Sequence, residues 1–191
     1  MNEIQPYIGY AAGILGFVPF VFLIISMRKG VTKPNLAGWV LYTVAMAMIV
    51  ASSIALNAWQ SLWLAIAYII GQSAVIFVSF KTGYFAFSRF DYACLSISLL
   101  SLALWIYTRN PLYALVLNVL VDALGTLAIA NKLYKYPGTE DTRAWSLSLA
   151  VATLNVFAVA SLDLSNALYP IYLIFANMLI VGLSLRTHSP I

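Results

Sequence analysis

Seven long apolar stretches run through this sequence, and they restrict the fold more than any other feature. A helix needs roughly 20 apolar residues to cross the hydrocarbon core of a bilayer, at about 1.5 Å per residue. The stretches are continuously apolar, whereas the strands of a membrane barrel are about half as long and alternate. The sequence therefore predicts an all-α integral membrane protein with seven transmembrane helices. The predicted spans cover residues 7–27, 36–56, 61–80, 90–107, 112–133, 144–162 and 167–185.

The composition excludes the soluble classes of protein. Hydrophobic residues make up 63% of the 191 residues and charged residues only 8%, where a soluble domain carries roughly 25%. The mean hydropathy is +0.92, so the chain has too little polar surface to cover a globular exterior. A soluble enzyme, a secreted domain and a disordered protein are excluded. The length predicts a single transmembrane domain over residues 1–191.

The distribution of basic residues predicts the orientation. In a seven-span arrangement, nine of the ten Lys and Arg residues fall on one side and only Arg109 on the other. Cytoplasmic loops carry the excess of positive charge in membrane proteins. We therefore expect the N-terminus outside and the C-terminus in the cytoplasm. This split also supports the fourth span, which is the least secure because it is the shortest and carries Ser96, Ser98 and Ser101.

The first and last three spans share an organisation that predicts an internal repeat. Trp39 and Trp145 each follow a basic loop and lie 106 positions apart, and the mid-span amides Gln72 and Asn177 lie 105 apart. A single intervening span gives both triplets the same orientation, which makes a parallel 3+1+3 repeat. The predicted repeats are residues 7–80 and 112–186, joined by a linker helix at residues 90–107.

Two segments carry related residues. The first is Gly16-Phe17-Val18-Pro19-Phe20 with Lys29 to Asn35 and Trp39, and the second is Asp122 with Gly125-Thr126, Tyr134, Pro137, Glu140 and Trp145. Together with the 3+1+3 pattern, these segments resemble the SWEET and PQ-loop transporter superfamily and are similar to bacterial seven-helix membrane proteins of that type. This resemblance implies transport by alternating access around a pocket at the membrane midplane. It also places an asparagine of the seventh helix, here Asn177, at that pocket. The KDEL receptor shares this architecture, so the fold alone does not decide between transport and reception.

Asp122 is the strongest single functional candidate, because it lies near the middle of the fifth span. A charge at that depth costs at least ~2.5–3.5 kcal/mol, so it should face the bundle interior or a water-filled cavity. Asn118 lies four residues earlier and is predicted on the same helix face. The pair either lines a substrate or proton site, or holds helices together through hydrogen bonds.

Three amides near the middle of their spans, Gln72, Asn155 and Asn177, are further candidates for substrate binding. An amide group offers both a donor and an acceptor, which suits the recognition of hydroxyl or amine groups. The alternative is a purely structural hydrogen bond between helices. Pro19 lies inside the first span, where it should kink the helix. That kink is either a hinge for alternating access or a fixed packing shape.

Aromatic residues gather near the outer ends of the spans, Tyr169 among them, and we interpret them as an interfacial belt.

Enzyme functions find little support in the sequence. No span contains histidine, only one acidic residue lies at mid-membrane, and no nucleotide-binding glycine-rich loop is present. We therefore expect no catalysis, no cofactor, no metal site and no nucleic-acid partner.

The sequence as a whole predicts a small-metabolite transporter, either facilitative or proton-coupled, in a bacterial cytoplasmic membrane. Its expected partners are the lipid bilayer and a small polar metabolite, namely a sugar, an amino acid or an amine. A receptor or assembly subunit that does not transport, and a lipid-handling protein with a groove open to the bilayer, remain alternatives. The oligomeric state stays open, a homo-oligomer included.

Overall fold

The computed structural model describes residues 5–55, 59–82, 87–158 and 164–186 of the chain. The regular structure in these residues is helical throughout, as expected for a chain whose backbone groups must find hydrogen-bond partners within lipid. The helices are α1 (Gln5–Leu15), α2 (Val18–Arg28), α3 (Leu36–Ala55), α4 (Trp59–Thr82), α5 (Arg89–Thr108), α6 (Pro111–Lys135), α7 (Thr142–Val156) and α8 (Leu164–Ser184).

Five helical segments of the described residues are long and apolar enough to cross a membrane, so the chain has the character of an integral membrane protein. They match the predicted first, third, fourth, fifth and seventh spans. The fourth, which was the least secure in the sequence, forms a full helix. The five segments are Tyr7–Arg28, Leu62–Lys81, Arg89–Thr108, Leu115–Lys135 and Ala167–Ser184.

The predicted second span forms α3, which runs from Leu36 to Ala55 and so agrees with the predicted residues 36–56. Its apolar stretch within the described residues is Leu36–Ala51. The sixth forms α7, which ends at Val156 rather than at residue 162. Residue 56 of the second predicted span and residues 159–162 of the sixth lie outside the described part of the chain.

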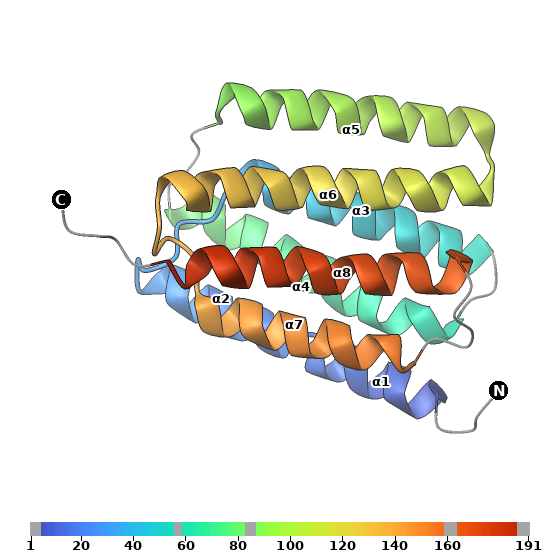
Figure 1. Cartoon of the computed structure of the whole chain (residues 1–191), viewed down its shortest axis with the longest axis horizontal. Helices are drawn as coiled ribbons and strands as arrows, with labels where there is room; N and C mark the ends of the chain where they lie inside the picture. The colour runs from blue at the N-terminus through green and yellow to red at the C-terminus, as the bar shows by residue number, and fades with distance from the viewer. Residues whose placement is uncertain (1–4, 56–58, 83–86, 159–163, 187–191) are drawn as a thin grey trace.

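Six helical rods form a closed ring, with α1 and α2 following one another as one rod (Figure 1). Around the ring, α4 packs between α1/α2 and α3, α3 packs on α6, and α8 packs between α6 and α7. The ring closes where α7 packs on α1 and α2. Helix α5 lies outside the ring against α6 and the edge of α3 (Figure 1). Helix α1 begins at the opposite end of the bundle from the end of α8.

The first rod is broken at Gly16 and Phe17, which form a turn between α1 and α2. We expected Pro19 to kink the first span, and the break lies just before it, directly after Leu15, whose carbonyl is four residues before the proline ring. Pro19 itself occupies the first turn of α2, where its missing N–H is least disruptive. Gly16 lies close to α4 at the break, since a Cβ there would lie 2.9 Å from Leu64 Cδ1.

Helices α3 and α6 approach each other closely through two facing glycines. A Cβ added to Gly38 would lie 2.6 Å from Ile129 Cγ1 and 3.0 Å from the Gly125 carbonyl oxygen. A Cβ added to Gly125 would lie 2.9 Å from the Tyr42 ring and 3.1 Å from the Gly38 carbonyl oxygen. Small residues permit such contacts between membrane helices, which associate by van der Waals packing because lipid is as apolar as a side chain.

This contact predicts that Gly38→Ala destabilises the protein although alanine favours helix formation. We expect a loss of about 1–3 kcal/mol from overpacking, seen as a lower melting temperature in detergent. Gly182→Ala is the matched control, because a Cβ at that helical glycine meets no atom within 4 Å. A melting temperature of Gly38→Ala equal to or above that of Gly182→Ala would contradict the close contact of α3 with α6.

Candidate functional site

A cavity of about 40 Å³ lies inside the ring of helices. A buried water needs on the order of 10–15 Å³ on this measure, so the cavity has room for a few water molecules. Every rod of the ring contributes to its wall, and α5 contributes nothing. The lining residues are Phe20, Trp39, Tyr42, Tyr68, Gln72, Asp122, Trp145, Ser148, Tyr169, Leu173, Ala176 and Asn177.

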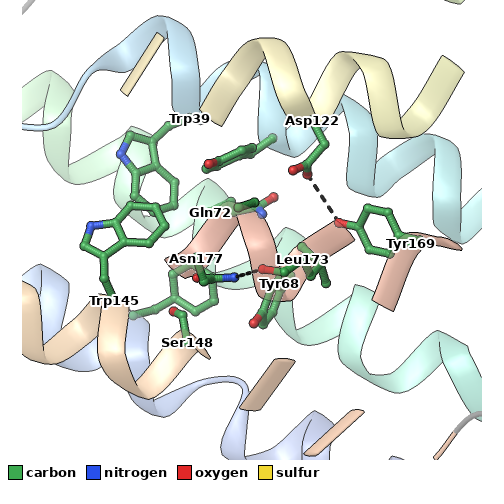
Figure 2. Close-up of a pocket in the computed structure, with 12 residues that line it drawn as sticks. Trp39, Tyr68, Gln72, Asp122, Trp145, Ser148, Tyr169, Leu173 and Asn177 are labelled. Carbon is green, nitrogen blue, oxygen red and sulfur yellow. Dashed lines mark hydrogen bonds between the residues drawn. The ribbon is translucent and has the colours of Figure 1, made fainter. Parts of the chain in front are cut away.

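The lining has two different ends, which Figure 2 shows. Trp39 and Trp145 stand side by side at one end, with ring centroids 5.8 Å apart. Asp122 and Tyr169 lie at the opposite end, and Gln72 lies between the two groups. The cavity is therefore apolar and aromatic toward one end and acidic toward the other.

Asp122 is 2% exposed and is held by tyrosines of α8. The Tyr172 hydroxyl donates to Asp122 Oδ2 at 2.8 Å, and the Tyr169 hydroxyl donates to Asp122 Oδ1 at 3.3 Å. Thr126 extends this network, since its hydroxyl lies 3.0 Å from the Tyr172 hydroxyl and 2.9 Å from the Tyr42 hydroxyl. The carboxyl group thus connects α3, α6 and α8 through hydroxyl groups.

Three of the five predicted site residues line the cavity: Asp122, Gln72 and Asn177. Gln72 is 3% exposed, and its Oε1 atom has no hydrogen-bond partner among the described residues. Asn177 is 5% exposed, and its amide nitrogen donates to the Leu173 carbonyl in its own helix at 2.7 Å. Gln72 therefore offers a free acceptor to a molecule in the cavity.

The other two predicted residues, Asn118 and Asn155, are buried but are not among the cavity-lining residues. Asn118 is 1% exposed, and its Oδ1 atom has no hydrogen-bond partner among the described residues. That Asn118 and Asp122 act in one site stays a prediction.

The aromatic residues that form half of the wall were not among the predicted site residues. The sequence analysis assigned Tyr169 to an interfacial belt, but the hydroxyl of Tyr169 points at Asp122 inside the bundle. The spacing of Tyr169 and Tyr172 carried a usable signal, because residues three apart face the same neighbour. Tyr42 and Tyr68 carried no such signal, since an aromatic residue in an apolar span is as frequently a packing residue as a ligand contact.

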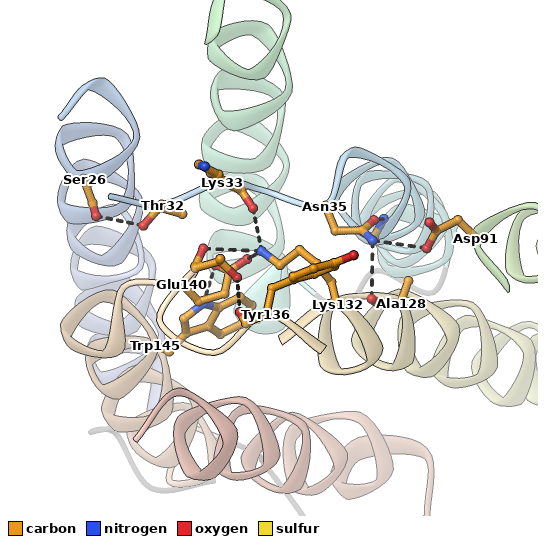
Figure 3. A network of polar contacts seen from close by, with 12 residues as sticks. Ser26, Thr32, Lys33, Asn35, Asp91, Ala128, Lys132, Tyr136, Glu140 and Trp145 are labelled. Carbon is orange, nitrogen blue, oxygen red and sulfur yellow. Dashed lines mark hydrogen bonds and ion pairs between the residues drawn. The ribbon is translucent and has the colours of Figure 1, made fainter. Parts of the chain in front are cut away.

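A second polar network lies at the end of the bundle that carries the basic loops (Figure 3). Lys132 of α6 forms an ion pair with Glu140, and the side chains of both are nearly inaccessible, at 6% and 0% exposure. Lys132 Nζ also donates to the Lys33 carbonyl oxygen at 2.5 Å. The second carboxylate oxygen of Glu140 accepts from Trp145 Nε1 at 3.1 Å. The network therefore ties the loops before α3 and α7 to a tryptophan of the cavity wall.

The loops before α3 and α7 also begin their helices in the same way. The Asn35 side chain accepts a hydrogen bond from the Gly38 N–H at 2.8 Å. The Asp141 side chain accepts from the Arg143 and Ala144 N–H groups at 2.9 and 3.1 Å. Such side chains satisfy backbone donors at a helix start. Asn35 also donates to Asp91 Oδ1 at 3.1 Å, which ties the start of α5 to this end of the bundle.

Comparisons with known proteins assign neither a family nor a function to this cavity. The chain matches no protein-family model, no curated protein and no solved structure.

The buried ion pair predicts that Glu140→Gln destabilises the protein strongly. The change leaves the Lys132 ammonium buried without its counter-charge, which costs about 3–5 kcal/mol in comparable cases. Chemical unfolding in detergent measures this loss of stability. The control is Lys135→Gln, which alters an exposed lysine of α6, the helix that also carries Lys132. The double variant Lys132→Met, Glu140→Gln should recover part of the loss. Equal stabilities of Glu140→Gln and Lys135→Gln would show that the pair is not buried as described.

Proposed function

We propose that this protein is a small-metabolite membrane transporter of the SWEET and PQ-loop type, which works by alternating access around the cavity. The observation that carries the proposal is the composition of the cavity wall. The residues matched by the sequence repeat line one cavity together: Trp39 with Trp145, and Gln72 with Asn177. Each triplet contributes one residue of each pair, so relative movement of the triplets would open and close the cavity.

The order of the helices around the ring supports the two-triplet arrangement. The first triplet runs α1/α2, α4, α3, and the second continues α6, α8, α7. In both, the third helix in sequence packs between the first and the second. The contact of α3 with α6 then corresponds to the contact of α7 with α1/α2. Each ring contact thus has a counterpart made by the matching helices, which is the pattern that a parallel repeat would produce.

The helix starts support the same relation. Asn35 and Asp141 lie 106 positions apart, the separation of Trp39 and Trp145, and both cap the start of their helix through a side-chain oxygen. In this arrangement the basic loops face the cytoplasm, following the excess of positive charge on that side. Trp39, Trp145 and the Lys132–Glu140 pair would then close the cavity toward the cytoplasm.

The role of Asp122 in this cycle is to bind substrate directly or to take up and release a proton. Both versions require the cavity to become accessible from each side of the membrane in turn. A facilitative transporter and a proton-coupled one therefore share the same structural requirement, and Asp122 is the residue whose loss should impair both.

The surroundings of Asp122 favour a second candidate function, a receptor or assembly subunit with this architecture that does not transport. Both oxygens of Asp122 already accept hydrogen bonds from Tyr169 and Tyr172, and the cavity is small. An aspartate that only holds α6 to α8 would have these contacts. Reciprocal access to the cavity is the property that separates the two functions.

Accessibility of a single cysteine tests transport without knowledge of the substrate. The native Cys94 is buried, so Cys94→Ser gives a background for Ser148→Cys in the cavity wall. We expect a membrane-impermeant thiol reagent to modify this position from either side, in right-side-out and in inside-out vesicles, because the cavity alternates between the two sides. Mass spectrometry of the purified protein measures the modified fraction.

Two control positions calibrate this measurement. Lys135→Cys lies at the exposed end of α6 and should react from one side only, while Phe175→Cys, on the 65% exposed outer face of α8, should react from neither. Modification of the cavity position from one side alone, with both controls behaving as expected, would contradict alternating access and favour the receptor.

A further inference from the structure

Half of the residues that line the cavity are aromatic, and four of them contact one another edge to face. The Phe20 and Tyr68 rings lie 5.5 Å apart at 84°, and the Trp39 and Tyr42 rings lie 5.7 Å apart at 86°. Phe20 also lies 6.2 Å from Trp39 at 67°. Such contacts join the positive edge of one ring to the negative face of another. Trp145 extends this set through its tilted contact with Trp39, and Tyr169 is the remaining aromatic residue of the wall.

The charge of the cavity has one sign. Asp122 is the only acidic residue among those that line it, and none of the lining residues is Lys, Arg or His. The nearby Lys132 is already paired with Glu140. A cation in the cavity would meet a carboxylate and aromatic rings, which both attract it. An anion, or the carboxylate of a zwitterion, would find no counter-charge.

Hydrogen-bonding groups in the cavity also remain unsatisfied. Gln72 Oε1, an acceptor, and Trp39 Nε1 and the Tyr68 hydroxyl, two donors, are buried without partners among the described residues. Buried polar atoms of this kind are rare in folded proteins and call for a ligand or a bound water. Asp122 adds acceptor capacity, because a carboxylate has about four lone-pair sites and the two tyrosines occupy two.

We propose that the cavity binds a small organic cation, an ammonium group with short substituents, with Asp122 as its counter-ion and the aromatic wall as its cage. Gln72 Oε1 accepts from an N–H or O–H of the ligand, and Trp39 Nε1 donates to a ligand oxygen. The substrate role of this cation rests on the proposed transport function, because the same cavity carries both. The small volume selects a compact headgroup over a sugar.

Binding to the purified wild-type protein in detergent tests the charge requirement directly. The probes are choline, ethanolamine, the zwitterion betaine, glucose, and 3,3-dimethyl-1-butanol, which replaces the choline nitrogen by carbon. We expect choline or ethanolamine to quench or shift the tryptophan fluorescence saturably and to raise the melting temperature. The neutral isostere, betaine and glucose should bind at least tenfold more weakly. Equal binding of choline and its neutral isostere, or binding of glucose alone, would overturn the proposal.

Variants locate the binding in the cavity. Asp122→Asn should weaken binding of the cation at least tenfold, and Trp39→Leu should weaken it about tenfold. Trp63→Leu is the matched control, since Trp63 is 46% exposed and packs on Tyr10 away from the cavity. A loss in Trp63→Leu as large as in Trp39→Leu would contradict the cage. If Asp122→Asn does not fold, two measurements still test the cation site. These are the affinity of Gln72→Leu for the cation and the comparison of choline with its neutral isostere in the wild type.

The two proposals fail separately. Cation binding together with one-sided modification of Ser148→Cys would retain the cation site and remove transport. Modification of Ser148→Cys from both sides, with no preference for the ammonium probes, would support transport and rule out the cation as its substrate.

Discussion

The packing of α3 against α6 is the contact on which the surroundings of Asp122 depend, because two facing glycines let these helices lie close together. Within lipid, helices gain no hydrophobic free energy from association, so contact distance and polar bonds decide where they meet. Gly38 and Gly125 allow each helix to lie against the carbonyl oxygens of the other. Tyr42 then lies beside Gly125, within reach of Thr126. The hydrogen-bond network that reaches Asp122 follows directly from this crossing.

The polar residues of the chain are divided between two sites with different chemistry. At the end with the basic loops, Lys132 and Glu140 neutralise each other and connect the loops before α3 and α7. In the interior, Asp122 has only hydroxyl groups as hydrogen-bond donors. Trp145 belongs to both sites, because its indole nitrogen donates to Glu140 while its side chain lines the cavity. A movement that breaks the loop network would therefore also move the aromatic end of the cavity wall.

The candidate site was predictable only in part, for a geometrical reason. A charged or amide side chain in an apolar span stands out in the sequence, which is why Asp122, Gln72 and Asn177 were found. Whether such a residue faces the cavity depends on the rotation of its helix. Asn118 and Asn155 have the same chemistry as Asn177, yet the cavity excludes them. The aromatic wall gave no signal, because aromatic residues are common both at lipid interfaces and in helix packing.

The sequence by itself determined that this is a helical membrane protein, because continuous apolar stretches have no other stable form in lipid. It also determined the 106-residue relation between Trp39 and Trp145 and the place of Asp122 within an apolar helix. The tertiary structure alone decided which residues meet around Asp122. That outcome depends on contacts between helices distant in the chain, such as Gly38 of α3 against Ile129 of α6, and spacing along one helix does not encode them.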